Sequence, residues 1–134
     1  MNYKKVLVIS AHADDEAFGM GATIFKMLQL GISVHWLIIT SVWKPRWSDQ
    51  QVFLRNSDTQ KVSDFFNFDS TIKWNFKDNR MDTISLDDYQ CKMIEVLENI
   101  KPDTIFCPSC SDWNKEHKIA YDIVEMSTKP YYSP

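Results

Sequence analysis

The sequence predicts an α/β fold, a Rossmann-like three-layer sandwich in which helices cover both faces of a mostly parallel sheet. Two observations support this prediction. Short runs rich in Val, Ile and Thr alternate with longer segments whose apolar residues recur at helical spacing. Helical connections of this length join parallel strands. The chain has 134 residues, enough for one modest core, so we expect a single domain over residues 1–134.

The N-terminal part of the chain predicts two strands separated by one helix. Residues 5–10 form a compact run rich in Val and Ile, which indicates a first strand. Residues 16–30 carry apolar side chains at helical spacing, and Gly31 is a typical helix stop. Residues 33–40 are again apolar and β-branched, which predicts a second strand.

The same alternation continues in the middle of the chain. Ser48 and Gln51 form a capping-box pattern, which predicts a helix through about Phe66. Residues 71–76 indicate a third strand, although the pattern there is weaker.

The last part of the chain predicts one more strand between two helices. Ser85 is expected to begin a helix that Pro102 ends, and residues 104–107 form a short fourth strand. A final helix is expected near residues 116–126. In the common strand order 3-2-1-4, the first and fourth strands are neighbours. Ligands then bind in the crevice beyond the carboxyl ends of these two strands.

Composition excludes several classes of partner. Fifteen basic and 18 acidic residues give a net charge of −3 without a basic cluster, so we expect no nucleic-acid partner. No apolar run approaches the ~18 residues of a spanning helix, so we expect no membrane partner. The three cysteines, Cys91, Cys107 and Cys110, cannot all pair in disulfides, which favours the cytoplasm.

Metal-ligating residue types follow the two strands that are expected to be neighbours. His12, Asp14 and Asp15 come directly after the first strand, and His117 follows the fourth. Two imidazoles and a carboxylate can hold a zinc ion at ~2.0–2.2 Å and leave a position open for water. The sequence alone does not decide which of the two aspartates would be the ligand.

Other interpretations of these polar residues stay open. Carboxylates at a helix start are favoured by the helix dipole, so the acidic run at residues 14–16 could serve stability alone. Gly19 and Gly21 are similar to a dinucleotide-binding pattern, but they lie inside the expected helix. The acidic residues in the preceding turn would repel a pyrophosphate.

The chain resembles the PIG-L/LmbE-like family of zinc-dependent N-deacetylases over nearly its whole length. The resemblance rests on four groups of residues: His12-Ala13-Asp14-Asp15-Glu16 with Gly19 and Gly21; Asp112 with Glu116-His117; Arg55-Asn56-Ser57-Asp58; and Lys101-Pro102-Asp103. The chain is therefore expected to be the N-terminal part of the usual family domain.

The resemblance implies a role for each motif residue. His12, Asp15 and His117 would ligate zinc, and Asp14 would be the general base. The implied reaction is removal of an N-acetyl group from an amino sugar or sugar conjugate. Zinc would lower the pKa of a bound water towards ~7. The implied partner is a small N-acetylated sugar or conjugate, and a homo-oligomer stays open.

Three residues depart from the family pattern. Ala13 stands where proline is usual, and Glu116 stands where aspartate is usual, as a longer carboxylate expected to orient His117. Asn114 falls where many members have a histidine that supports the oxyanion. We count Asn114 as a catalytic candidate, although an amide can donate a hydrogen bond but cannot transfer a proton.

The chain also stops early for this family, at residues 131–134. The sequence thus predicts a fold truncated at the C-terminus, as a fragment, a truncated product or a minimal form completed by a neighbouring subunit. The alternative function is a truncated, catalytically inactive relative that binds metal or sugar. Hydrolysis of another amide, such as an N-acyl amino acid conjugate, is a third hypothesis.

Arg55, Asp78 and Trp113 are the candidates for substrate binding. Each has a plainer interpretation: Arg55 could form a surface ion pair with Asp58, Asp78 could belong to an ordinary turn, and the wall position of Trp113 is open. Trp43 and Trp47 could likewise stack on a sugar or pack in a loop. The Cys-x-x-Cys pattern at residues 107–110 and His35 are interpreted as structural.

Overall fold

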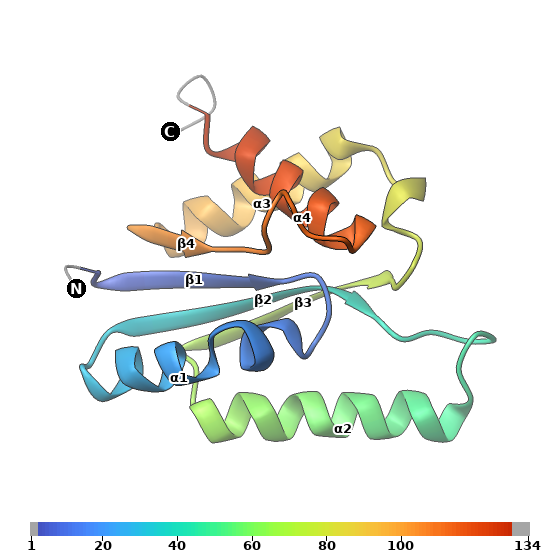
Figure 1. Ribbon diagram of the computed structural model, residues 1–134, viewed down its shortest axis with the longest axis horizontal. Helices are drawn as coiled ribbons and strands as arrows, with labels where there is room; N and C mark the ends of the chain where they lie inside the picture. Colours follow the sequence, from blue (N-terminus) through green and yellow to red (C-terminus); the bar gives the residue numbers. More distant parts are fainter. Residues whose placement is uncertain (1–2, 130–134) are drawn as a thin grey trace.

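The computed structural model describes residues 3–129 and contains one four-stranded sheet (Figure 1). All strand pairs are parallel, and the order is β3-β2-β1-β4, which confirms the predicted topology. The strands are β1 (Lys5–Ser10), β2 (Ser33–Ser41), β3 (Ser70–Lys77) and β4 (Thr104–Phe106). The chain end at residues 131–134 lies outside the described residues.

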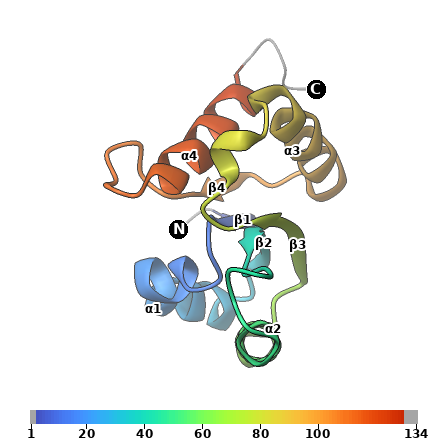
Figure 2. The ribbon, with the colours of Figure 1, turned by 90° about the vertical axis from the view of Figure 1, so that its right-hand side faces the viewer.

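Helices cover both faces of the sheet, which confirms the three-layer prediction. Helices α1 (Asp15–Gln29) and α2 (Asp49–Phe66) lie on one face, as the end-on view in Figure 2 shows. Helices α3 (Leu86–Ile100) and α4 (Lys115–Ser127) lie on the other, after a short 3₁₀ turn at Met81–Thr83. Within residues 3–129, no helix is long and apolar enough to span a membrane.

Strand β1 is one of the two inner strands of the sheet and pairs with both β2 and β4. Its side chains alternate between two apolar clusters. Leu7 and Ile9 pack towards α3 and α4, whereas Val6 and Val8 pack towards α1 and α2. A strand covered on both faces needs apolar residues at every position, which explains the continuous run in the sequence.

The predicted helix ends agree with the structure to within one or two residues because capping signals define them. The Ser48 hydroxyl accepts from the Gln51 N–H, and the Gln51 side chain accepts from the Ser48 N–H, so the predicted capping box is present. Gly31 has φ +72°, and the N–H groups of Gly31 and Ile32 donate to carbonyls of the last turn of α1. Helix α3 ends at Ile100, and its C-cap residue Lys101, with φ +52°, directly precedes Pro102.

Strand β3 differs from the plain strand predicted at residues 71–76, because it contains a bulge. The pairing with β2 shifts between Ile38 and Thr40, and Asn75 has φ +57°. One residue of β2 therefore faces two residues of β3. A pattern of alternating polarity does not reveal such an insertion, so the sequence could not predict it.

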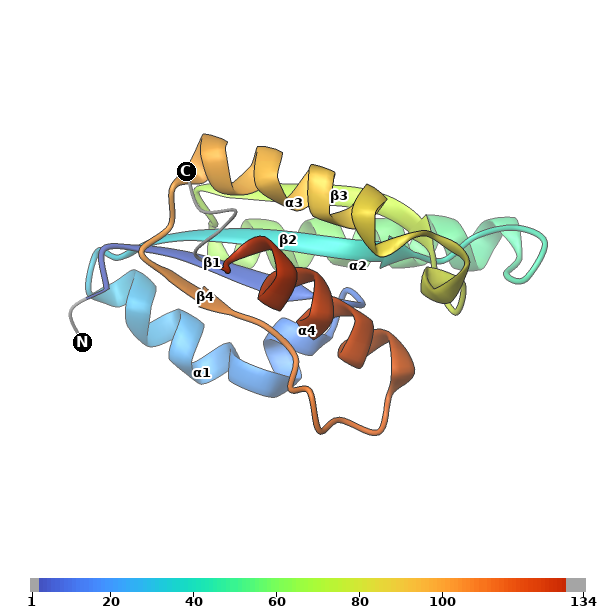
Figure 3. The same ribbon diagram turned by 90° about the horizontal axis from the view of Figure 1, so that it is seen from above.

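The crossovers place a crevice between β1 and β4. The chain leaves β1 for α1 on one face of the sheet, and leaves β4 for α4 on the other face (Figure 3). The segments that follow these two neighbouring strands therefore separate, and polar side chains gather between them.

Candidate metal centre

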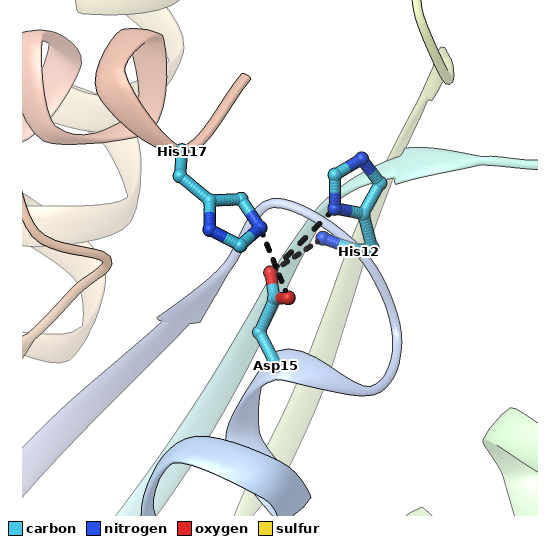
Figure 4. A group of neighbouring side chains, drawn as sticks. All are labelled: His12, Asp15 and His117. Atoms are coloured by element: carbon cyan, nitrogen blue, oxygen red, sulfur yellow. Dashed lines mark hydrogen bonds and ion pairs between the residues drawn. The ribbon is translucent and has the colours of Figure 1, made fainter. Parts of the chain in front are cut away.

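Three side chains converge in the crevice beyond β1 and β4 (Figure 4). His12 lies in the turn that joins β1 to α1, Asp15 is the first residue of α1, and His117 lies in the first turn of α4. One possible ligand atom from each lies within 4.8 Å of the others. The structure thus brings together the three residues predicted as ligands, from segments about a hundred residues apart.

The Asp15 carboxylate lies between the two imidazoles. Its Oδ1 is 3.1 Å from His117 Nε2, and its Oδ2 is 3.8 Å from His12 Nδ1. The His12 backbone N–H also donates to Oδ2 at 2.9 Å, which fixes the carboxylate in the turn. One nitrogen of each ring therefore faces the same carboxylate.

The other nitrogen of each imidazole is held by an outer carboxylate. His12 Nε2 is 2.8 Å from Glu116 Oε2, and His117 Nδ1 is 2.9 Å from Asp112 Oδ2. Such carboxylate–histidine pairs orient metal-ligating imidazoles and raise their basicity. The pairing corrects the expectation that Glu116 orients His117. Neighbouring residues of a helix point in different directions, so Glu116 reaches across to His12 and accepts the Met81 N–H instead.

The electrostatics of the cluster favour positive charge. Burial alone lowers the pKa of His12, but hydrogen bonds and charge from Asp15 and Glu116 outweigh it and raise that pKa to about 10. Burial opposes the charged forms of Asp15 and Glu116 as well, yet their contacts with His12 hold both carboxyl pKa values below the ordinary range. A divalent cation at this position would be stabilised by the same carboxylates. Two nitrogens and a carboxylate oxygen also match the donor set of an open zinc site, so the residues fit this metal.

A cavity of about 400 Å³ opens beside the three side chains. Its polar wall includes Asp14, Arg55 and Asp78, so the structure places these three predicted residues together. Asp78 is only 7% exposed, its N–H donates to Ser41 O, and its own carbonyl accepts from Trp43 Nε1. These contacts bury Asp78 more deeply than an ordinary turn would.

Comparison with known families identifies the chain. Residues 7–127 match the family model described as PIG-L, GlcNAc-PI de-N-acetylase. The chain belongs to the PIG-L family. This confirms the resemblance inferred from the motifs at residues 12–16 and 112–117. A comparison with curated proteins finds no match for this chain.

Solved structures share the PIG-L fold with this chain at low sequence identity. The N,N'-diacetylchitobiose deacetylase of Pyrococcus horikoshii has a TM-score of 0.80 at 21% identity, covering 94% of this chain and 49% of its own. The A40926 pseudoaglycone deacetylase has a TM-score of 0.80 at 16% identity, with 98% and 61% covered. The 4-carboxy-2-hydroxymuconate hydratase of Pseudomonas putida has 0.74 at 18% identity, with 92% and 55% covered. The chain thus spans about half to three-fifths of these proteins, and the likeness concerns the fold.

Two acidic residues of the first PIG-L motif have unequal surroundings. Asp14 is the N-cap residue of α1, but its side chain makes no capping hydrogen bond, so its carboxylate is available to the cavity. Glu16 is 2% exposed and accepts from the Ser10 hydroxyl at 3.2 Å. Burial raises the pKa of Glu16 to about 7. Glu16 therefore belongs to the core beneath the site, which is more than the helix-start role expected for it.

Asn114, the amide in the second PIG-L motif, begins helix α4. Its Oδ1 accepts the Glu116 N–H at 2.8 Å, and the residue also lines the cavity. Because the cap uses the side-chain oxygen, the amide nitrogen is the group that can still donate to a ligand. Sequence reasoning identified Asn114 as a site candidate but missed its capping function.

The structure does not place Trp113 in the cavity wall, which corrects that expectation. The indole is 99% exposed and is not among the lining residues. Its neighbours turn inward, since Asp112 Oδ1 accepts the Asn114 N–H and Asn114 itself caps α4, so Trp113 points outward. Trp47 lines the cavity instead.

The lining residues that sequence reasoning missed include Lys73 and Asn75 of β3. A period-2 pattern places these two residues on one face of the strand, and that signal was available in the sequence. The interpretation of His35 as structural is consistent with its contacts, because both ring nitrogens lie within hydrogen-bonding distance of the hydroxyls of Ser33 and Ser70.

Proposed function

We propose that this chain carries the centre of a zinc-dependent hydrolase that removes an N-acetyl group from an amino sugar or sugar conjugate. The observation that carries the proposal is the paired arrangement of the cluster. Each imidazole directs one nitrogen to Asp15 and the other to its own outer carboxylate, Glu116 or Asp112. Ion-pair networks that serve stability alone do not require two imidazoles to share a carboxylate at the mouth of a cavity.

His12 Nδ1, the Asp15 carboxylate and His117 Nε2 would hold the zinc ion. When bound, zinc supplies a Lewis acid and a water of lowered pKa. Asp15 acts as a ligand because it lies between both rings, whereas Asp14 is directed to the cavity.

Asp14 is the general base of the proposed reaction. Its carboxylate takes a proton from the attacking water and then delivers it to the departing amine nitrogen. Asn114 donates its amide N–H to the carbonyl oxygen of the substrate, where negative charge develops as the carbon becomes tetrahedral. Asp14 and Asn114 both line the cavity, although they lie far apart in the sequence.

The substrate would lie in the cavity, with Arg55 and Asp78 as binding residues. An amino-sugar amide is supported by the names of two similar structures, a deacetylase of N,N'-diacetylchitobiose and one of a pseudoaglycone. Hydrolysis in the cytoplasm is proposed because Cys91, Cys107 and Cys110 are all free thiols.

A second candidate is a metal- or sugar-binding relative without catalytic activity. The observation that favours it is Asn114, which stands where many family members have a histidine and cannot transfer a proton. The two functions differ in whether acetate is released, so a single assay separates them.

The test uses chelator-treated protein reloaded with zinc. We expect about one zinc per chain by metal analysis, and acetate release from N,N'-diacetylchitobiose or another member of an N-acetyl amino-sugar panel. Asp14→Asn should keep the zinc and lose about 10²–10⁴-fold in kcat, since an amide cannot accept the proton. Protein that binds no zinc would overturn the proposal. Zinc-loaded protein that releases no acetate would favour the second candidate.

A further inference from the structure

Two cations line the cavity without a charged partner. Arg55 comes from α2 and Lys73 from β3. The surface pair with Asp58, the alternative interpretation of Arg55, is not among the ion pairs of residues 3–129; Asp58 pairs with Lys61 at 3.0 Å instead. Among residues 3–129, no ion pair involves Arg55 or Lys73. The proposed reaction places Arg55 among the substrate-binding residues, but it does not say which substrate group the two cations bind.

The fold directs both side chains to the cavity. On α2, Arg55 and Thr59 are one helical turn apart, both line the cavity, and the buried Thr59 hydroxyl donates to Arg55 O at 2.8 Å. On β3, Trp74 packs into the core beneath α3, so Lys73 and Asn75 occupy the opposite face of the strand.

Amide groups accompany the two cations. Asn56 follows Arg55 on α2, and Asn75 lies at the bulge of β3, where φ is +57°. Bulges beside functional sites redirect side chains, and Asn is one of the few residues that adopt this backbone region readily. The wall formed by α2 and β3 therefore presents two positive charges and two amides that can donate hydrogen bonds.

The charged residues that line the cavity come from different elements of the fold. Asp14 and Asp15 lie at the start of α1, directly after β1, whereas the two cations come from α2 and from the edge strand β3. Asp78 also lines the cavity, but it is only 7% exposed and its Oδ2 accepts from Asn79. Because β2 lies between β1 and β3 in the sheet, a ligand in the cavity would meet the metal cluster beyond β1 and the two cations on the side of β3 and α2.

We propose that the substrate carries an anionic group, a carboxylate or a phosphate, which Arg55 and Lys73 bind with help from Asn56 and Asn75. Guanidinium groups bind such anions in a bidentate manner, and lysine adds a point charge. The placement of the scissile amide of the substrate at the metal cluster rests on the proposed function. The anionic group binds the wall whether or not hydrolysis follows.

The test is a binding measurement that needs no turnover. Titration calorimetry compares N-acetylglucosamine with its 1-phosphate, its 6-phosphate and a uronic acid of the same sugar, which distinguishes a phosphate from a carboxylate. Inorganic phosphate is titrated in parallel. We expect at least one anionic sugar to bind about tenfold or more tightly than the neutral sugar at low salt, since charge-assisted hydrogen bonds are the strong ones.

Two variants test whether the preference for anionic sugars depends on the wall formed by α2 and β3. Lys73→Met and Arg55→Gln should each reduce the ratio of anionic to neutral affinity several-fold. Lys61→Met, on the same helix as Arg55 and paired with Asp58, is the matched control and should leave the ratio unchanged. If the protein hydrolyses the anionic sugar, the two wall variants should raise KM more than they lower kcat, because the contact is equal in ground and transition states.

Three outcomes would overturn the proposal: equal affinity for neutral and anionic sugars, a preference that survives both wall variants, and inorganic phosphate binding as tightly as the sugar phosphates. These outcomes are distinct from those that would overturn the proposed function. If the protein releases acetate but shows no preference for anionic sugars, only the anionic-substrate proposal is wrong. If it prefers anionic sugars but releases no acetate, only the hydrolase proposal is wrong.

Discussion

Each histidine of the cluster has its two ring nitrogens committed to different partners. Asp15 lies between the rings, and the outer carboxylates Glu116 and Asp112 fix their orientation. The outer pairs have different burial, because Glu116 is 6% exposed, whereas the Asp112 side chain is 36% exposed. The buried pair therefore constrains His12 more strongly than solvent-screened Asp112 constrains His117.

Glu116→Gln tests this difference at the residue scale. The amide can still accept the Met81 N–H, but it removes the negative charge beside His12. We expect zinc affinity to fall by about 10–100-fold, the usual effect of losing an outer carboxylate. Competition with a chromophoric chelator measures the zinc affinity. Asp112→Asn is the matched variant on His117 and should cost less, and an unchanged affinity in both variants would contradict the assigned roles.

The sequence was sufficient to predict that His12, Asp15 and His117 converge, but insufficient to assign their partners. His12, Asp15 and His117 follow two strands that the topology makes neighbours, so their convergence was predictable. The contact from Glu116 to His12 depends on the orientation of α4 over the sheet and on the buried Met81 N–H. No local pattern encodes these long-range contacts.

At the scale of elements, short polar contacts join strands that are distant in sequence. Asp103, just before β4, accepts the backbone N–H groups of Lys4 and Lys5 at 2.8 and 3.0 Å. These bonds fix the start of β1 beside the start of β4. They set the register of the two strands whose opposite ends carry the site.

Asp103→Asn should lower the Tm by a few degrees at pH 7. Hydrogen bonds from the Lys4 and Lys5 backbone hold the pKa of the Asp103 carboxyl below its ordinary value of 3.8. A carboxyl with a lowered folded-state pKa contributes stability above its unfolded pKa and loses it as the pH falls through the folded value. The Tm difference between variant and native protein should therefore shrink below about pH 3.8. A difference that stays constant into acid would contradict this account.

The bulge at Asn75 leads to a second prediction at the scale of elements. The residue has φ +57°, a region that costs β-branched residues roughly 1–2 kcal/mol. Asn75→Val should lower the free energy of unfolding by about that amount, whereas Asn75→Gly, which accepts this backbone, should change it little. Denaturant titration compares the two variants. Equal effects would mean that the left-handed conformation does not determine the cost.

Helix boundaries were predictable because caps are local, as at Ser48 and Gly31. The bulge in β3 was not predictable, because apolar and polar residues of the strand still alternate through the inserted residue. The period-2 pattern of the sequence places Lys73 and Asn75 on one face of β3. That this face borders the cavity follows only from the packing of Trp74 against the opposite helices.

At the scale of the whole molecule, the cluster joins the first and last elements of the described chain. His12 and Asp15 follow β1, and His117 belongs to α4, so a metal bound by all three would connect both ends of the sequence across the sheet. The strand order that creates this neighbourhood was predictable from the alternation of strands and helices. Binding and global stability should therefore be coupled.

Zinc should consequently raise the Tm of the metal-free protein. Any ligand that binds only the folded state stabilises it according to its concentration relative to Kd. A free zinc concentration of about 1,000 times Kd corresponds to about 4 kcal/mol, or roughly 15 °C for a domain of this size. Thermal denaturation with and without zinc measures the shift, and a chelator should reverse it. His117→Ala should remove most of the shift because it removes one ligand. His35→Gln alters the one other histidine of the chain, whose ring nitrogens lie near the hydroxyls of Ser33 and Ser70 and not in the cluster, so it should retain the full shift. If zinc stabilised the His117 variant as much as the native protein, the ion would be binding elsewhere, and the cluster would not be the link between the two ends of the fold.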